Sequence, residues 1–314
     1  MKGVVVKSTG SWYLVRDEAG QLHRARLRGK FKLKGMKVSN PLAVGDRVEF
    51  EVEEAGEDTA VINKIEDREN YIIRQSTHKT AYSHIIAANL DQALLIVTLV
   101  SPRTSFGFMD RFLVTAEAYD IPTILIFNKT DLYDDEMRDY QRQISHMYEQ
   151  IGYQSLAVSA KNNEGIEETK ALLKGKTTLL SGHSGVGKSS LINLIVPDLE
   201  LKTSEISGFS DKGVHTTTFA EMFEIDDDTF IIDTPGIKEL GIVDIPPAEL
   251  SHYFPEMRER LNQCRFNNCT HFNEPGCAVI EAVRHNEISL TRYESLTGGG
   301  RGRTARPPAR RHQG

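Results

Sequence analysis

Short apolar segments with an alternating pattern occupy the first 70 residues of this 314-residue chain. Turn-forming residues separate them, most clearly at residues 18–20 and 44–46. Because successive side chains of a strand point to opposite faces, alternation predicts strands with one buried face. Five such strands favour a small β-barrel. We expect them at residues 3–6, 12–16, 21–27, 47–52 and 60–65.

A different pattern begins at residue 90, where apolar runs alternate with longer amphipathic segments. Short runs rich in Val, Ile and Leu are typical of parallel strands that are covered on both faces. The alternation predicts an α/β domain, with a parallel sheet between two layers of helices. Its expected strands are residues 94–100, 123–127, 155–158, 177–180 and 230–232, and its expected helices are residues 110–119, 136–151, 165–173 and 187–195.

These patterns divide the chain into five parts. The barrel, residues 1–70, suits the oligonucleotide-binding (OB) type, and a linker, residues 71–89, connects it to the α/β domain at residues 90–242. Residues 243–296 predict a small helical domain. The last part, residues 297–314, holds five arginines and no acid, and its many Gly and Pro residues predict a disordered tail. This tail is either an RNA-binding segment or an added extension.

Charge and hydropathy indicate a cytosolic protein that does not enter a membrane. The longest apolar stretch, residues 94–100, is far too short to span a bilayer, and the amino terminus lacks the features of a secretory signal. The net charge of −6 argues by itself against a nucleic-acid partner. The balance of 26% charged and 39% hydrophobic residues is ordinary for a globular chain, and we expect a monomer.

One segment of the barrel reverses this charge balance. Residues 22–45 contain seven Lys or Arg and no acid. In an extended strand, a period of two places these cations on one face, where they would bind RNA phosphates. The alternative is a solvated face whose charges protect a sheet edge. The candidate RNA-binding residues are Arg24, Arg26, Arg28, Lys30, Lys32 and Lys34.

The segment 182–189, Gly-His-Ser-Gly-Val-Gly-Lys-Ser, is a phosphate-binding loop. It joins an expected strand to an expected helix, whose N-terminus favours anions, and its glycines let backbone N–H groups face the phosphates. Lys188 is expected to bridge the β- and γ-phosphates and to act in catalysis, and the Ser189 hydroxyl to bind Mg²⁺. The expected nucleotide contacts are Gly182, Ser184, Gly185, Val186, Gly187, Lys188, Ser189 and Ser190.

The segment 128–131, Asn-Lys-Thr-Asp, follows an expected strand at the sheet edge where such folds bind ligands. By similarity to GTPases, the Asp131 carboxylate accepts hydrogen bonds from the guanine ring N–H and exocyclic amine, while Asn128 and Lys129 hold the base and the loop. Adenine lacks this pair of donors, so the motif selects GTP over ATP. A second base-contacting loop is expected at Ser159, Ala160 and Lys161.

The segment 233–236, Asp-Thr-Pro-Gly, ends another expected strand. Asp233 is expected to hold Mg²⁺ through water, and the Gly236 N–H to contact the γ-phosphate. Either Thr216 or Thr217, in the first switch position, is expected to complete the Mg²⁺ shell when GTP is bound. The sequence does not choose between these two threonines.

Ile237 stands where Ras-like GTPases carry the Gln that orients the attacking water. Because an isoleucine side chain neither donates nor accepts a hydrogen bond, we expect slow intrinsic hydrolysis, with the missing group supplied from elsewhere. His215 is the nearest titratable candidate, and the hypothesis is that it orients water or stabilises charge after a partner orders the switch. The alternative is a role in loop packing.

Three cysteines and a histidine lie close together in the helical part: Cys264, Cys269, His271 and Cys277. In a reducing compartment, an odd number of cysteines argues against a disulfide framework. Three thiolates and one imidazole form a full tetrahedral set for Zn²⁺, with no position left for a catalytic water. The pattern predicts one structural zinc site; the alternative is three buried thiols beside an incidental histidine.

The order of the motifs differs from that of ordinary GTPases, in which the phosphate loop comes first. Here the guanine motif precedes it, which predicts a circularly permuted GTPase domain. Together with the barrel and the cysteine cluster, this order resembles the RsgA family of bacterial GTPases, over nearly all of residues 1–296. The resemblance implies a late assembly factor that binds the small (30S) ribosomal subunit and its rRNA. Its hydrolysis of GTP to GDP would be stimulated by the subunit and accompany release.

Two other functions stay open from the sequence. One is a GTPase that acts on another RNA, such as a large-subunit assembly factor or a translation regulator. The other is an RNA-binding scaffold whose nucleotide site no longer turns over. Ile237 permits the scaffold, whereas the intact Lys188 and Asp233 argue against it.

Overall fold

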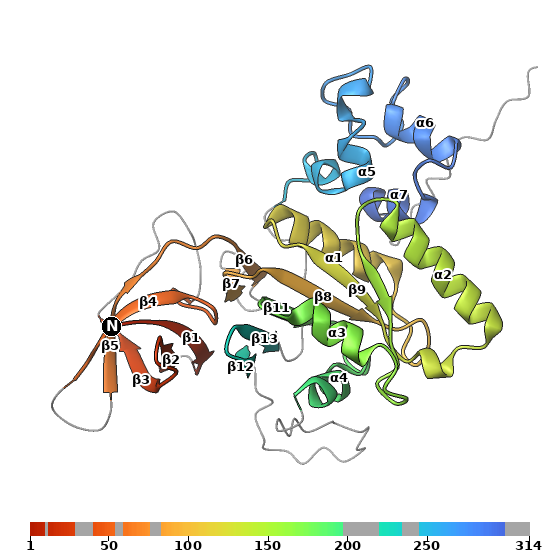
Figure 1. Ribbon diagram of the computed structural model, residues 1–314. Coiled ribbons are helices and arrows are strands. Elements are labelled where there is room, and N and C mark those ends of the chain that lie inside the picture. Colours follow the sequence, from red (N-terminus) through yellow and green to blue (C-terminus); the bar gives the residue numbers. More distant parts are fainter. Residues whose placement is uncertain are drawn as a thin grey trace, which may run out of the picture.

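The computed structural model describes residues 1–9, 12–28, 40–53, 59–75, 83–196, 220–233 and 245–298. These residues form a barrel, a central sheet covered by helices, and a carboxyl-terminal helical part (Figure 1). None of the described helices is long and apolar enough to cross a membrane. Several candidate residues lie outside the described ranges: Lys30, Lys32, Lys34, His215, Thr216, Thr217, Gly236 and Ile237.

The five amino-terminal strands form the predicted barrel. They are β1 (Lys2–Ser8), β2 (Tyr13–Asp17), β3 (Leu22–Leu27), β4 (Arg47–Val52) and β5 (Thr59–Ile65). Their order is β1-β2-β3-β5-β4, and β4 pairs back with β1 to close the barrel. The β3–β5 pair is parallel, whereas the other pairs are antiparallel. Alternate side chains such as Val15, Ala25 and Phe50 are buried in its core.

The central sheet contains the five predicted parallel strands. They are β8 (Gln92–Val97), β9 (Thr123–Phe127), β10 (Ser155–Ala157), β11 (Thr177–Ser181) and β13 (Thr229–Asp233). Their order is β10-β9-β8-β11-β13. An additional strand, β12 (Glu221–Asp226), lies antiparallel beside β13 and is absent from the predicted elements.

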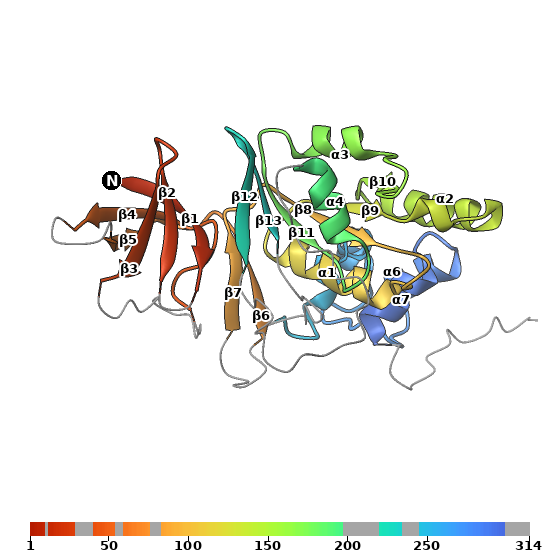
Figure 2. The same ribbon diagram turned by 90° about the horizontal axis from the view of Figure 1, so that it is seen from below.

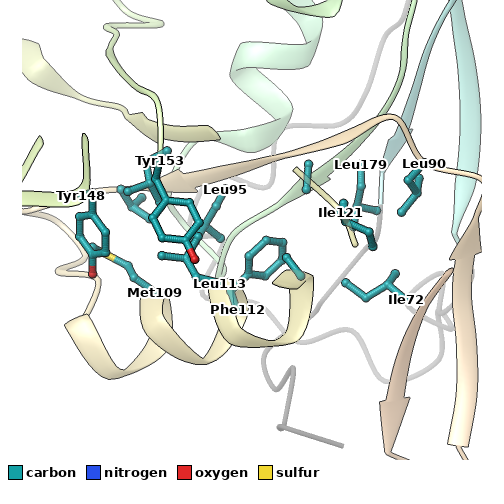
Figure 3. Close-up of a cluster of buried hydrophobic side chains, with 14 of the residues drawn as sticks. Ile72, Leu90, Leu95, Met109, Phe112, Leu113, Ile121, Tyr148, Tyr153 and Leu179 are labelled. Carbon is teal, nitrogen blue, oxygen red and sulfur yellow. The ribbon is translucent and has the colours of Figure 1, made fainter. Parts of the chain in front are cut away.

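Two helices cover each face of this sheet, as predicted. They are α1 (Phe106–Ala118), α2 (Asp135–Glu149), α3 (Ile166–Leu173) and α4 (Lys188–Ile195). Alternate residues of β8 separate the two cores: Leu95 packs with α1 and α2, whereas Leu94 packs with α3 and α4. Figure 3 shows part of the first core, in which side chains of α1, including Phe112 and Leu113, lie close to Leu95.

Two element ends differ from the prediction around residue 100. The strand expected at residues 94–100 ends at Val97, because Thr98 donates its backbone N–H to the Thr104 hydroxyl (3.0 Å) and the chain turns. The helix expected from residue 110 already begins at Phe106. The Ser105 side chain accepts the N–H of Phe108 and caps the helix there.

The barrel and the central sheet are joined through their strands. β1 pairs with β12 at Lys7 and Glu221, so strands of the two parts form one continuous sheet, which Figure 2 shows from below. Ion pairs follow this seam, with 2.7 Å between Lys7 Nζ and Glu221 Oε1 and 2.5 Å between Arg16 Nη2 and Glu224 Oε1.

The stretch expected as a linker contains two paired strands, β6 (Tyr71–Gln75) and β7 (Ser83–Ala88). Ile72 is fully buried in the same core as α1. Asn89, directly after β7, donates from Nδ2 to Gly45 O in the barrel and accepts the Glu69 N–H, both at 2.9 Å. The structure therefore has strands, fixed to both neighbours, where the sequence predicts only a connection.

The carboxyl-terminal part packs on α1 and α2 (blue in Figure 1). Its elements are η2 (Leu250–Tyr253), α5 (Pro255–Arg258), η3 (Leu261–Gln263), α6 (Ala278–Arg284) and α7 (Leu290–Thr297). Val114 of α1 belongs to their apolar core. Arg292 of α7 is 1% exposed and lies 2.6 Å from Asp110 of α1 and 2.7 Å from Glu256. A buried ion network thus joins this part to the helices that cover the central sheet.

Candidate functional site

The phosphate loop lies at the carboxyl end of β11 and leads into α4. Gly182, Gly185 and Gly187 have φ angles of 151°, 86° and 91°, which other residues rarely adopt. A Cβ atom on Gly187 would also lie 2.4 Å from Asn128 Nδ2, and one on Gly182 would lie 2.4 Å from Ile96 O. Only glycine fits these positions, so the loop is a narrow backbone cradle at a helix start, where anions bind.

Lys188 supplies the positive charge of this cradle. Its half-buried side chain folds back over the loop, and Nζ donates to Gly182 O at 3.0 Å. Burial lowers the pKa of Lys188, whereas the negative charge of Asp233 on the neighbouring strand raises it. A bound phosphate would add negative charge beside the amine and favour its ammonium form.

The guanine motif lies beside the phosphate loop, after β9. Asn128 is buried and connects three loops. Its Nδ2 donates to Val186 O at 2.8 Å, and its Oδ1 accepts the Ala160 N–H at 3.3 Å. The Lys129 side chain donates to Ser101 O at 2.6 Å. Motifs that are far apart in the chain therefore meet at one place.

Asp131 is held with its carboxylate at the edge of a cavity of about 450 Å³. Its Oδ1 accepts a hydrogen bond from the Ser159 hydroxyl (2.8 Å), and Lys161 Nζ lies 3.8 Å from Oδ2. A carboxylate among the base-motif residues and a phosphate loop on the same cavity match the two ends of a guanine nucleotide. The cavity is lined by Asn128, Lys129, Asp131, Leu132, Ala160, Lys161, Gly187 and Ser190.

Ser189 and Asp233 occupy positions suited to magnesium ligands. Ser189 is in the first turn of α4, and Asp233 ends β13, which pairs with β11 directly before the phosphate loop. Mg²⁺ prefers hydroxyl, carboxylate and phosphate oxygens, so these residues fit an ion that binds together with the nucleotide.

The predicted metal ligands converge in the carboxyl-terminal part. The ligand atoms of Cys264, Cys269, His271 and Cys277 all lie within 4.8 Å of one another. His271 Nδ1 is 3.3 Å from Cys277 Sγ and 3.6 Å from Cys264 Sγ. Burial raises the pKa of Cys269 to about 12, whereas a bound cation would stabilise the thiolate. This group can hold a metal ion, and its donor set fits zinc.

The Glu274 carboxylate fixes the loop between the candidate metal ligands. Although burial favours the neutral acid, hydrogen bonds from Thr270 and from the backbone of the loop lower the pKa of Glu274 to about 2. The Tyr293 hydroxyl donates to His271 O at 2.8 Å. Hydrogen bonds within the protein therefore hold the loop that carries these candidate metal ligands.

The basic strand of the barrel presents its arginines to solvent. Arg24, Arg26 and Arg28 are exposed, whereas the alternate residues His23 and Ala25 are buried. Arg26 pairs with Glu53, directly after β4, at 2.8 Å. An acidic side chain from outside residues 22–45, which contain no acid, therefore lies on this basic face. The Arg24 guanidinium lies 4.2 Å from the ring centroid of Trp12.

Two family models match the chain. The RsgA N-terminal domain covers residues 2–62, and the RsgA GTPase covers residues 65–243. The chain belongs to the RsgA family. A Bacteroides fragilis protein named small ribosomal subunit biogenesis GTPase RsgA is 52% identical to it, over 94% of both chains. The relative of that name from Cytophaga hutchinsonii is 53% identical over 94% of this chain and 96% of its own.

Two solved structures share this fold over 95% of the chain. YjeQ from Thermotoga maritima is 38% identical with a TM-score of 0.76, and the match covers 95% of this chain and 96% of that one. YloQ, described as a circularly permuted GTPase, is 32% identical with a TM-score of 0.72 over 95% and 93% of the two chains. The predicted fold, with its permuted GTPase domain, is confirmed.

A further loop of this RsgA GTPase domain touches the candidate nucleotide site, and the sequence analysis missed it. Residues 98–105 connect β8 to α1. Besides Ser101, which accepts from Lys129, Pro102 lies next to Gly185, and Thr104 Oγ1 is 2.7 Å from His183 Nε2. The sequence gives only a weak signal for this contact, namely a cluster of Thr, Ser and Pro directly after a buried strand.

Proposed function

We propose that this RsgA GTPase binds the maturing small ribosomal subunit and that GTP hydrolysis accompanies its release. Relatives that match more than nine-tenths of the chain are named small ribosomal subunit biogenesis GTPases, and these names support this target. The observation that carries the nucleotide assignment is the Asn128–Val186 hydrogen bond of 2.8 Å, which joins the base motif to the phosphate loop. One guanine nucleotide then fills a single continuous site.

Each motif has a distinct role in the proposed hydrolysis. Asp131 and the Ser159–Lys161 loop hold the base, and the backbone N–H groups of residues 182–190 bind the phosphates. Lys188 stabilises the negative charge that spreads over the transferred phosphoryl group. Ser189 and, through water, Asp233 would hold magnesium, which would neutralise further phosphate charge.

The groups that complete catalysis are proposed from the sequence. The Gly236 N–H contacts the γ-phosphate, and Thr216 or Thr217 joins the magnesium shell. Because the side chain of Ile237 has no polar atom, His215 positions the attacking water in its place. Replacing His215 with Ala tests this role: subunit-stimulated phosphate release should fall, and an unchanged stimulated rate would exclude it.

We also propose that the four-residue metal site holds Zn²⁺ and that the barrel binds rRNA through Arg24, Arg26 and Arg28 together with Lys30, Lys32 and Lys34. Trp12 is the sole tryptophan of the chain. Because Arg24 stacks on it, RNA that engages Arg24 should change the intrinsic fluorescence, and Arg24→Ala should weaken both the binding and this signal. We propose further that the protein is a monomer in the cytoplasm.

Phosphate release from GTP tests the proposed target. It should be slow for the isolated protein, rise with purified small subunits and stay low with large subunits. ATP should compete poorly with GTP. Stimulation by large subunits would instead indicate a different ribosomal target, and nucleotide binding without turnover in any mixture would indicate a scaffold.

A further inference from the structure

His183, inside the phosphate loop, is the residue through which this loop contacts α1. Its Nε2 lies 2.7 Å from Thr104 Oγ1, in the connection that leads into α1. Its ring meets the edge of Phe108, in the first turn of that helix, with 5.5 Å between centroids and an interplanar angle of 85°. Phosphate binding by the loop backbone does not itself require a histidine at this position.

With a neutral imidazole, the hydrogen bonds around His183 have one consistent direction. Ser184 O can only accept, so the Nδ1 atom of His183, 3.1 Å away, carries the proton. Nε2 then accepts the hydroxyl proton of Thr104, whose oxygen in turn accepts the Thr98 N–H at 3.0 Å. The chain of donors and acceptors is complete when the imidazole is neutral.

The contact with Ser184 O also fixes the direction of an N–H group. In a planar trans peptide, the carbonyl and the following N–H point in opposite directions. Holding Ser184 O on the side of His183 therefore turns the Gly185 N–H to the other side of the loop. Gly185 is one of the expected phosphate contacts, so His183 prepares its donor for the nucleotide.

The same helix carries the helical metal-binding part. Asp110, two residues beyond Phe108, is 1% exposed, and it binds Arg292 (2.6 Å) and accepts from the Tyr148 hydroxyl (2.8 Å). Further along, Glu117 pairs with Arg258 at 3.2 Å. Helix α1 thus contacts the phosphate loop at its first turn and the carboxyl-terminal helical part along its length.

We propose that His183 is a positioning residue that aligns the phosphate loop on α1 and thereby makes nucleotide affinity depend on how the metal-binding part is seated on that helix. The inference rests on the proposed GTP site and adds its regulation. A partner that shifts this part, such as an RNA surface, would change the affinity for GTP and GDP through α1.

The first test compares variants of His183 by titration with a fluorescent GDP analogue. His183→Leu removes the hydrogen bonds and should raise the dissociation constant about three- to tenfold, the range expected for one or two hydrogen bonds. His183→Gln keeps an acceptor for Thr104 at the position of Nε2 but loses the donor to Ser184 O, so it should restore part of the affinity. His146→Leu, which removes an exposed imidazole of α2, is the matched control and should bind as wild type.

The second test is a double-mutant cycle with Asp110→Asn, which leaves Arg292 paired with Glu256 and should therefore fold. Asp110→Asn should weaken GDP binding in the wild-type background and have little further effect in the His183→Leu background. Glu256→Gln serves as a second variant of the network if Asp110→Asn does not retain its metal and its helix content.

Wild-type affinity for His183→Leu would overturn the inference, and so would equal effects of the network variants with and without His183. Loss of affinity in His183→Gln as severe as in His183→Leu would also contradict the positioning role. Failure of the proposed function looks different, because wild-type protein would then show no preference for guanine nucleotides or no response to the small subunit.

Discussion

Asn128 and Val186 are separated by 58 positions in the chain, yet a hydrogen bond of 2.8 Å joins the Asn128 side chain to the Val186 carbonyl. The residue that follows Val186 is a glycine because Asn128 occupies the space that a side chain there would need. The base-reading and phosphate-binding segments are therefore shaped against each other. Changes in either should affect the binding of the whole nucleotide.

Gly187→Ala should raise the dissociation constant for GDP tenfold or more, about 1.4 kcal/mol or above. The added methyl group would meet Asn128 Nδ2 and displace the buried amide. Gly152→Ala is the matched control, since Gly152 has a similar φ of 98° but no atom within 4 Å of the new Cβ. It should cost about 1 kcal/mol of stability and leave GDP affinity unchanged. Equal GDP affinity of the two variants would show that the Asn128 contact is unimportant.

Asp131→Asn should change the base preference from guanine to xanthine. The carboxylate can only accept hydrogen bonds, whereas an amide also donates one, and xanthine has a carbonyl where guanine has its exocyclic amine. Competition of GTP and XTP for the fluorescent GDP analogue measures the change. Ser159→Ala, which removes the hydroxyl that supports Asp131, should weaken GTP binding without a gain for XTP. Retained guanine preference in Asp131→Asn would mean that another group reads the base.

Arg292→Met should destabilise the protein by about 3–5 kcal/mol, because Asp110 and Glu256 would stay buried without their shared cation. Chemical unfolding followed by circular dichroism measures the loss. Arg284→Met is the control: Arg284 pairs with Glu281 at 3.0 Å, but its side chain is 41% exposed. Its loss should cost less than about 1 kcal/mol. Similar costs for the two variants would contradict the structural importance of the buried network.

Removal of the metal should loosen residues 245–298 while the barrel stays folded. Without a cation, the cluster leaves three thiols and an imidazole facing one another, and structural zinc contributes directly to folding. Limited proteolysis after treatment with a zinc-selective chelator should show cuts in this region, and added zinc should restore resistance whereas magnesium should not. Unchanged cleavage of metal-free protein would mean that the fold does not need the ion.

The sequence is informative where the chemistry is local. The phosphate loop, the 128–131 motif and the four metal ligands each lie within a short segment whose residue types and spacing specify their chemistry, so they could be predicted without the fold. The pairing of β12 with the barrel could not, because its partner there, Lys7, precedes Glu221 by 214 positions. The contact of Thr104 with His183, 79 positions apart, is hidden for the same reason.

The burial of Arg292 is a second feature that the sequence hides. Its charge predicts an exposed side chain, and only the meeting of α1, α5 and α7 in space supplies the carboxylates that allow it to be buried. Prediction therefore fails at interfaces between parts of the chain, where a residue's partners come from elements that have no fixed spacing from it.

Circular permutation also decides what is attached to the catalytic strand. β13 ends at Asp233, the expected magnesium carboxylate, and only residues 234–244 separate it from the metal-binding part. With the usual order of segments, the same strand would lead into the remaining half of its own domain. Circular permutation therefore places the carboxyl-terminal part directly after the strand that carries the expected magnesium carboxylate. A movement at the end of this strand would therefore act on the carboxyl-terminal part without an additional switch segment.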